Sequence, residues 1–195
     1  MSENTASPAT RLTVQPDATG RLLLLLPAPE GSGTVEILLG QQKGAMLRLA
    51  SLAYLQAGYS DTAIEWAQWA LNDAPHEPAN YVHLSTIHMR LGDTAKAESL
   101  LAEALESLPQ ATALLRQRGS VALQRGDMDE AFNWARHAAE VAPFDAGLQI
   151  NLANLLVQAG EFDEARDILL RLLDQQPGLT AALRLLSVVS QRLGD

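Results

Sequence analysis

The chain has 195 residues, of which 47% are hydrophobic and 5% aromatic, and its 14 Lys and Arg residues against 23 Asp and Glu residues give a net charge of −9. This hydrophobic content is enough to bury a core, and the negative charge argues against a sequence-independent nucleic-acid binder and against attachment to an anionic membrane. Because the sequence has no cysteine, disulfides, thiol catalysis and thiolate metal sites are excluded. The apolar residues are mostly leucine and alanine, which predicts packed helices.

No part of the sequence resembles a targeting or membrane-spanning segment. The most apolar run near the N-terminus covers only residues 22–26. A signal peptide needs ~7–15 apolar residues directly after a basic end, and a spanning helix needs about 20. We therefore expect a cytoplasmic protein that does not insert into a membrane.

The N-terminal part of the chain predicts a tail followed by a β-hairpin. Residues 1–9 are small and polar, a composition that predicts a disordered tail. Residues 11–14 and 21–26 flank residues 15–20, a segment that contains proline and glycine and is typical of a turn. The two flanking runs are therefore predicted to pair as antiparallel strands.

Residues 35–39 fit either a third strand or the start of a helix, and periodicity does not separate the two. A strand at residues 22–26 has apolar residues on both faces, so both faces need a cover. The helical part that follows is one such cover, and a second element or a second protein chain is the other. We interpret residues 10–43 as a β-rich element that caps the helical part or docks a partner. Self-association through it is a further hypothesis, and a purely intramolecular cap is the alternative.

Downstream of residue 43, several residue types recur at a fixed interval of 34 residues. Independent positions that share one period over four copies indicate an internal repeat. A glycine that tolerates positive φ suits the end of a first helix, and a proline suits the end of a second. The recurring residues are Gly58, Gly92, Gly126, Gly160 and Gly194; Ala63, Ala97, Ala131 and Ala165; Ala70, Ala104 and Ala138; and Pro75, Pro109, Pro143 and Pro177.

This repeat resembles the tetratricopeptide repeat (TPR) family, whose unit is a helix–turn–helix of the same length, and GEFDEA at residues 160–165 is close to that family's consensus turn. The resemblance implies an all-α fold, a right-handed α-solenoid of four TPR helix–turn–helix repeats plus a fifth A helix, preceded by the small β-hairpin-like element. The repeats are predicted at residues 44–77, 78–111, 112–145 and 146–179, followed by 180–195 as a C-terminal capping helix or half repeat. Helix A is predicted at 44–57, 78–91, 112–125, 146–159 and 180–193, and helix B at 60–73, 94–107, 128–141 and 162–175.

The predicted helix at 180–193 is unusually apolar for a cap, and the sequence stops in the turn that follows it. One interpretation is that the chain continues beyond residue 195 or that this C-terminal face docks on a partner or on another copy. The other is a plain cap over the fourth repeat.

The third repeat departs most from the family pattern, because Arg118 stands where leucine is usual. A buried arginine needs a partner, and Glu103, Glu106 or Glu140 is the predicted one. The alternative is an arginine that extends past the edge of the core into solvent.

Charge placement is the most specific functional signal. The predicted A helices contain seven arginines and no Asp or Glu, and in the family the A helices line a concave groove. Arg48, Arg116 and Arg184 recur in every second repeat, at a position from which some family members present a lysine to a peptide terminus. Asn151 and Asn154 resemble the asparagine ladders by which some members bind an extended backbone.

The resemblance and these charges predict a scaffold that binds a peptide or protein segment with acidic and apolar residues in the groove. The alternative is that the arginines balance acidic residues of neighbouring repeats. The candidate groove residues are Arg48, Leu52, Leu55, Met89, Arg90, Arg116, Leu123, Asn151, Asn154, Arg184 and Arg192.

No pattern of catalytic or metal-ligating residues is present, so we expect no enzyme, no cofactor and no metal. His83 and His88, for example, lie about 140° apart around one predicted helix, which makes them poor joint ligands. Two further functions stay open. The chain fits the docking region of a longer enzyme such as a glycosyltransferase or sulfotransferase, or a bacterial secretion or assembly chaperone.

Overall fold

The computed structural model describes residues 13–16, 22–27, 34–39 and 43–194. The predicted tail at residues 1–9 and most of the predicted turn at 15–20 lie outside the described residues.

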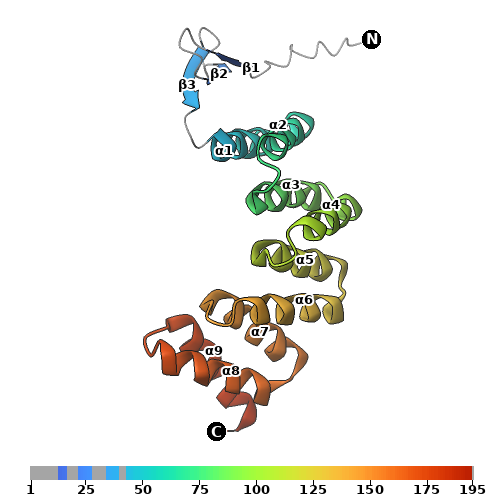
Figure 1. Ribbon diagram of the computed structural model, residues 1–195. Coiled ribbons are helices and arrows are strands. Elements are labelled where there is room, and N and C mark those ends of the chain that lie inside the picture. Colours follow the sequence, from blue (N-terminus) through green and yellow to red (C-terminus); the bar gives the residue numbers. More distant parts are fainter. Residues whose placement is uncertain (1–12, 17–21, 28–33, 40–42, 195) are drawn as a thin grey trace, which may run out of the picture.

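Three short antiparallel strands, in the order β1-β2-β3, precede the helices (Figure 1). They are β1 Thr13–Pro16, β2 Leu22–Pro27 and β3 Thr34–Leu39. Leu24 in β2 lies opposite Val14 on one side and Ile37 on the other. Of the two structures open for residues 35–39, the strand is the one observed. The predicted start of the turn at residue 15 was wrong, because Gln15 and Pro16 belong to β1.

Nine helices follow in residues 43–194, and they confirm the predicted all-α solenoid. Each helix packs against the next one in the chain, and α1 and α3, α3 and α5, and α7 and α9 are also in contact. We call α1, α3, α5, α7 and α9 the A helices and the others the B helices. The bounds are α1 Lys43–Gln56, α2 Ser60–Asp73, α3 Pro78–Arg90, α4 Thr94–Ser107, α5 Thr112–Arg125, α6 Met128–Val141, α7 Ala146–Ala159, α8 Phe162–Gln175 and α9 Thr180–Leu193.

The recurring glycines and alanines have the local roles expected of them. Gly126 ends α5 with φ +80° and Gly160 ends α7 with φ +85°, a backbone conformation that favours glycine. Within each repeat, helices A and B cross where both carry small residues. In the third repeat, Gly119 of α5 faces the backbone of Ala131 in α6, and Ala131 is fully buried. Larger residues at either position would separate the two helices.

Asn80 joins the first two repeats. It is fully buried at the start of α3, and its side-chain amide donates to the carbonyl oxygens of Ala70 and Ala74 at the end of α2, both at 2.9 Å. Each of these carbonyls also accepts from a backbone N–H, Ala70 from Ala74 and Ala74 from Glu77, both at 3.2 Å, so Asn80 supplies a second hydrogen bond to each. Asn80 therefore fixes the angle at which the second repeat follows the first.

Candidate functional site

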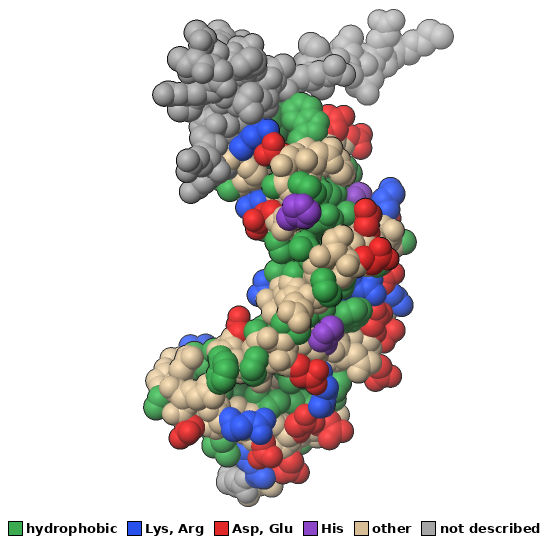
Figure 2. Space-filling model, in the orientation of Figure 1, with side chains coloured by type: hydrophobic (Ala, Val, Ile, Leu, Met, Phe, Trp, Pro, Cys, Tyr) green, Lys and Arg blue, Asp and Glu red, His purple; other side chains and the backbone are tan. Residues whose placement is uncertain are grey.

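The A helices form one wall of the solenoid and the B helices the other. In Figure 2, carboxylate side chains gather along the right-hand edge, over the B helices α2, α4 and α6, and the surface is hollowed on the left, between α1 and α9. We call the wall formed by the A helices the concave face. The sequence places seven arginines and no acidic residue in the predicted A helices, so the acidic residues of the repeats lie outside these helices.

Four of the predicted groove arginines are exposed and form no ion pair with any described residue. Arg90 ends α3, Arg116 lies in α5, and Arg184 and Arg192 lie in α9. Their guanidinium groups have donors available for a carboxylate.

Arg48 is different, because it is only partly exposed and donates from Nη1 to Oδ1 of Asn80 at 2.5 Å. The carbonyl oxygen of the Asn80 side chain is thus satisfied from α1, while its amide group binds α2. Arg48 therefore connects the first repeat to the second.

His83 of α3 lies near both Arg48 and Arg90. Burial lowers the pKa of His83 to about 4, and repulsion from these two arginines acts in the same direction. Its Nε2 is 2.9 Å from Oγ of Ser51, and that hydroxyl donates to the carbonyl oxygen of Ala63 at 2.7 Å. Because the Ser51 proton is used on Ala63, Nε2 of His83 carries the proton and Nδ1 is an acceptor.

Hydrogen bonds from two glutamines of α5 to Met89 and Thr86 connect α5 to α3. Gln117 donates from Nε2 to Oγ1 of Thr86 at 3.1 Å and to Sδ of Met89 at 3.3 Å. Gln124 donates to the carbonyl oxygen of Met89 at 3.1 Å. Met89, a predicted groove residue, is therefore partly committed to packing between repeats.

The remaining predicted groove residues divide by exposure. Leu52, Leu55 and Asn151 are half-buried, whereas Asn154 is exposed and Leu123 is 39% exposed. Leu55 packs against the core formed by the first and second repeats. The exposed members of the predicted set are thus Arg90, Arg116, Leu123, Asn154, Arg184 and Arg192.

Arg118 has a glutamate partner, as predicted, but the glutamates named as candidates were wrong. Its side chain is 15% exposed, and Nη2 contacts Oε1 of Glu130 at 3.0 Å, not Glu103, Glu106 or Glu140, which are all exposed. Nη1 donates to the carbonyl oxygen of Glu98 at 3.2 Å. The reason is that the first turn of α6 crosses α5 beside Arg118, which brings Glu130 within reach.

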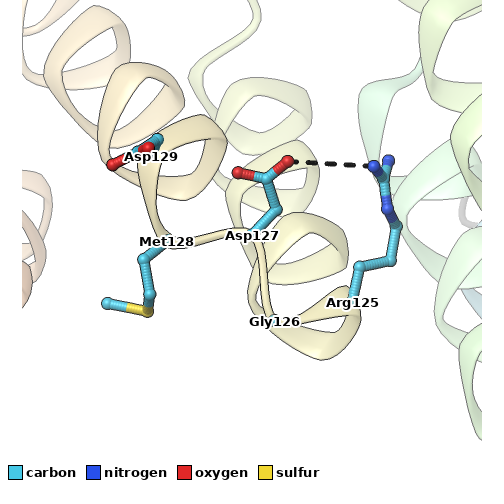
Figure 3. Close-up of a pocket in the computed structure, with 5 residues that line it drawn as sticks. All are labelled: Arg125, Gly126, Asp127, Met128 and Asp129. Carbon is cyan, nitrogen blue, oxygen red and sulfur yellow. Dashed lines mark ion pairs between the residues drawn. The ribbon is translucent and has the colours of Figure 1, made fainter.

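Arg125, at the end of α5, is also paired with acidic residues. It contacts Glu98 of α4, Oε2 of Glu130 at 3.4 Å and Oδ2 of Asp127 at 3.8 Å. Figure 3 shows Arg125 and Asp127 pointing toward each other at the α5–α6 turn, which lines a shallow depression of about 450 Å³. The hydrogen bond to Glu98 raises the pKa of Arg125. Arg118 and Arg125 therefore balance acidic residues, whereas Arg90, Arg116, Arg184 and Arg192 do not.

Sequence reasoning missed His83 and the two glutamines as residues of the concave face. The repeat pattern could have pointed to two of them, because His83 and Gln117 occupy the same repeat position as the predicted groove residue Asn151. Over the described residues, no group of three or more His, Asp or Glu side chains is arranged to hold a metal ion. None of the helices described is long and apolar enough to span a bilayer.

The sequence matches models of a known protein family. Two models of the tetratricopeptide repeat match residues 84–146 and 122–188. A curated relative, human tetratricopeptide repeat protein 7B, is 32% identical over 89 residues, which are 46% of this chain and 11% of that protein. The chain thus spans about a tenth of the length of that relative.

Solved structures share the architecture at low identity. A thermophilic TPR protein of Thermus thermophilus gives a TM-score of 0.60 at 24% identity, over 78% of this chain and 82% of that one. MamA protein gives 0.58 at 16% identity, over 80% and 85%. The structure of Naa15/Naa10 bound to HypK-THB gives 0.61 at 19% identity, over 78% of this chain and 23% of that one. These likenesses establish the fold.

Proposed function

Since residues 84–188 of the chain belong to the tetratricopeptide repeat family, we propose that this protein is a scaffold, without catalytic activity of its own, that binds a protein segment along its concave face. The observation that carries the proposal is the set of exposed arginines on the A helices that no described acidic residue neutralises, Arg90, Arg116, Arg184 and Arg192.

The chemistry of the face selects an acidic and apolar segment. Unpaired guanidinium groups bind carboxylates with two parallel hydrogen bonds. Leu123 on α5, which is 39% exposed, offers an apolar contact. Asn154 on α7 adds an amide that can pair with the backbone of an extended ligand. Bound in this way, the segment has carboxylates spaced to meet α5 and α9.

Arg116 and Arg184 are the residues to change, because neither contributes an ion pair to the fold of the described residues. We expect Arg116→Glu and Arg184→Glu together to weaken binding of a labelled peptide of alternating leucine and glutamate at least about tenfold. Fluorescence anisotropy measures the affinity, and the same peptide with glutamine in place of glutamate binds weakly to the unaltered protein.

Arg171→Glu in α8 is the matched control for Arg116→Glu, since it makes the same charge change on an exposed B-helix residue. Unchanged affinity in the Arg116/Arg184 double variant would refute the proposal. Equal loss in the Arg171 variant would do the same, because it would reduce the effect to net charge.

We also propose the division of the chain into repeats at 44–77, 78–111, 112–145 and 146–179, with 180–195 as a half repeat or cap. In this division residues 10–43 cap the first repeat or dock a partner. Limited proteolysis tests this division. We expect the first cleavage to fall N-terminal to residue 44 and not within a repeat.

A further inference from the structure

Four aromatic side chains form a continuous row in the first repeat. Ring centroids are 6.1 Å apart for Tyr59 and Tyr54, 6.5 Å for Tyr54 and Trp66, and 5.1 Å for Trp66 and Trp69. Trp66 is 3% exposed and belongs to the core, but Trp69 is 47% exposed on the B helix α2. A large aromatic ring that is half exposed marks a place where a partner gains contact area.

In the third repeat, an arginine side chain packs on a tryptophan ring. The guanidinium of Arg118 lies over the Trp134 ring, 5.1 Å from its centroid. Oε1 of Glu130, four residues before Trp134, accepts from both the indole Nε1 and Arg118 Nη2, each at 3.0 Å. A tryptophan and a glutamate one helical turn apart therefore hold an arginine between them.

Glu65 and Trp69 repeat this spacing on the outer surface of α2, but without an arginine. Both side chains are exposed, and residues four apart lie on the same face of a helix. Among the described residues no cation pairs with Glu65 or lies over Trp69. The helix has three acidic residues, Asp61, Glu65 and Asp73, and no Lys or Arg. Asp73 is paired with Lys43 of α1.

We propose that Glu65 and Trp69 bind an arginine side chain of a basic segment in a partner protein. The ring face attracts the guanidinium and the Glu65 carboxylate pairs with it, as Trp134 and Glu130 do for Arg118. Arginine is preferred to lysine, because a planar guanidinium stacks on the ring and presents a fork of donors to the carboxylate. This site is independent of the concave face and takes a ligand of the opposite charge.

The experiment uses the full chain and a synthetic peptide of alternating arginine and glycine. The protein has three tryptophans, so its indole N–H signals are few, and Trp69→Phe identifies that of Trp69. We expect the peptide to shift the Trp69 signal in a saturable way and to leave the Trp134 signal in place. Trp69→Ala and Glu65→Gln each weaken binding about tenfold, and a lysine–glycine peptide binds more weakly than the arginine peptide.

Glu103→Gln is the matched control, because Glu103 is an exposed residue of α4 that occupies in the second repeat the position of Trp69 in the first. It makes the same charge change as Glu65→Gln and is expected to leave the affinity unchanged. Full affinity in Trp69→Ala, or equal losses in the Glu65 and Glu103 variants, overturns the proposal. A mass in sedimentation velocity that rises with protein concentration and falls in Trp69→Ala also overturns it, since a second copy then covers the ring.

Discussion

The Oε1 atom of Glu130 accepts a hydrogen bond from Arg118 at 3.0 Å and, at the same distance, from the indole of Trp134. Nε of Arg118 is buried and has no hydrogen-bond partner among the described residues. The third repeat thus replaces the usual leucine by a charged residue that depends on a single carboxylate.

Removing that carboxylate leaves Arg118 buried without its charge partner. We expect Glu130→Gln to lower the free energy of unfolding by about 2 kcal/mol, since the site is only partly enclosed. Urea denaturation followed by circular dichroism measures this value. Arg118→Leu restores the family residue, and in that background Glu130→Gln is expected to cost less than about 1 kcal/mol. An equal cost in both backgrounds would contradict the role given to the pair.

Asn80 satisfies two carbonyl groups at the end of α2 and accepts from Arg48. Replacing it by alanine removes these three hydrogen bonds from a buried place, although each carbonyl keeps its backbone partner, so Asn80→Ala is expected to cost about 2 kcal/mol. The control is Asn154→Ala on the exposed surface of α7, which should stay within about 0.5 kcal/mol of the original protein. Thermal unfolding of the two variants makes the comparison.

Gly160 has φ +85°, and a side chain there is strained even though nothing lies within 4 Å of the added Cβ. We expect Gly160→Ala to lower stability by about 1 kcal/mol. Gly178 also has open space around it but not a positive φ, so Gly178→Ala serves as the control and should be near neutral. A penalty at Gly178 equal to that at Gly160 would show that backbone conformation is not the cause.

The pKa of His83, about 4 in the folded protein, lies below its ordinary value of 6.5. Between these values the unfolded chain binds more protons than the folded one, so stability rises with pH. The contribution is fully present above pH 6.5 and is lost as the pH falls through 4. His83→Gln keeps a donor for Ser51 and should reduce the dependence of stability on pH in this window. NMR titration of the imidazole checks the pKa directly, and a midpoint near the ordinary value would disprove the account.

The helices were predictable from local chemistry. The predicted helix 44–57 is observed as α1 Lys43–Gln56, and 112–125 agrees with α5 Thr112–Arg125. Gly126 ends α5 because of its own backbone freedom, and Pro143 follows the end of α6 because it lacks an N–H group. Such causes act within a few residues, so they are visible in a linear pattern.

The candidate site was predictable only in outline. The sequence places Arg48, Arg118 and Arg125 in A helices, and only Arg48 was among the predicted groove residues. The structure assigns Arg48 to Asn80, and Arg118 and Arg125 to Glu98 and Glu130.

By itself, then, the sequence determined the repeat, its helices and the basic character of the A helices, because a fixed period and helix-terminating residues are local properties. Only the tertiary structure decided which arginines stay unpaired and that Trp69 lies half exposed beside the buried Trp66. These depend on the angle at which α4, α5 and α6 meet and on contacts between residues far apart in the chain, such as Arg118 with Glu130 and Arg48 with Asn80. No periodicity in one chain encodes that geometry.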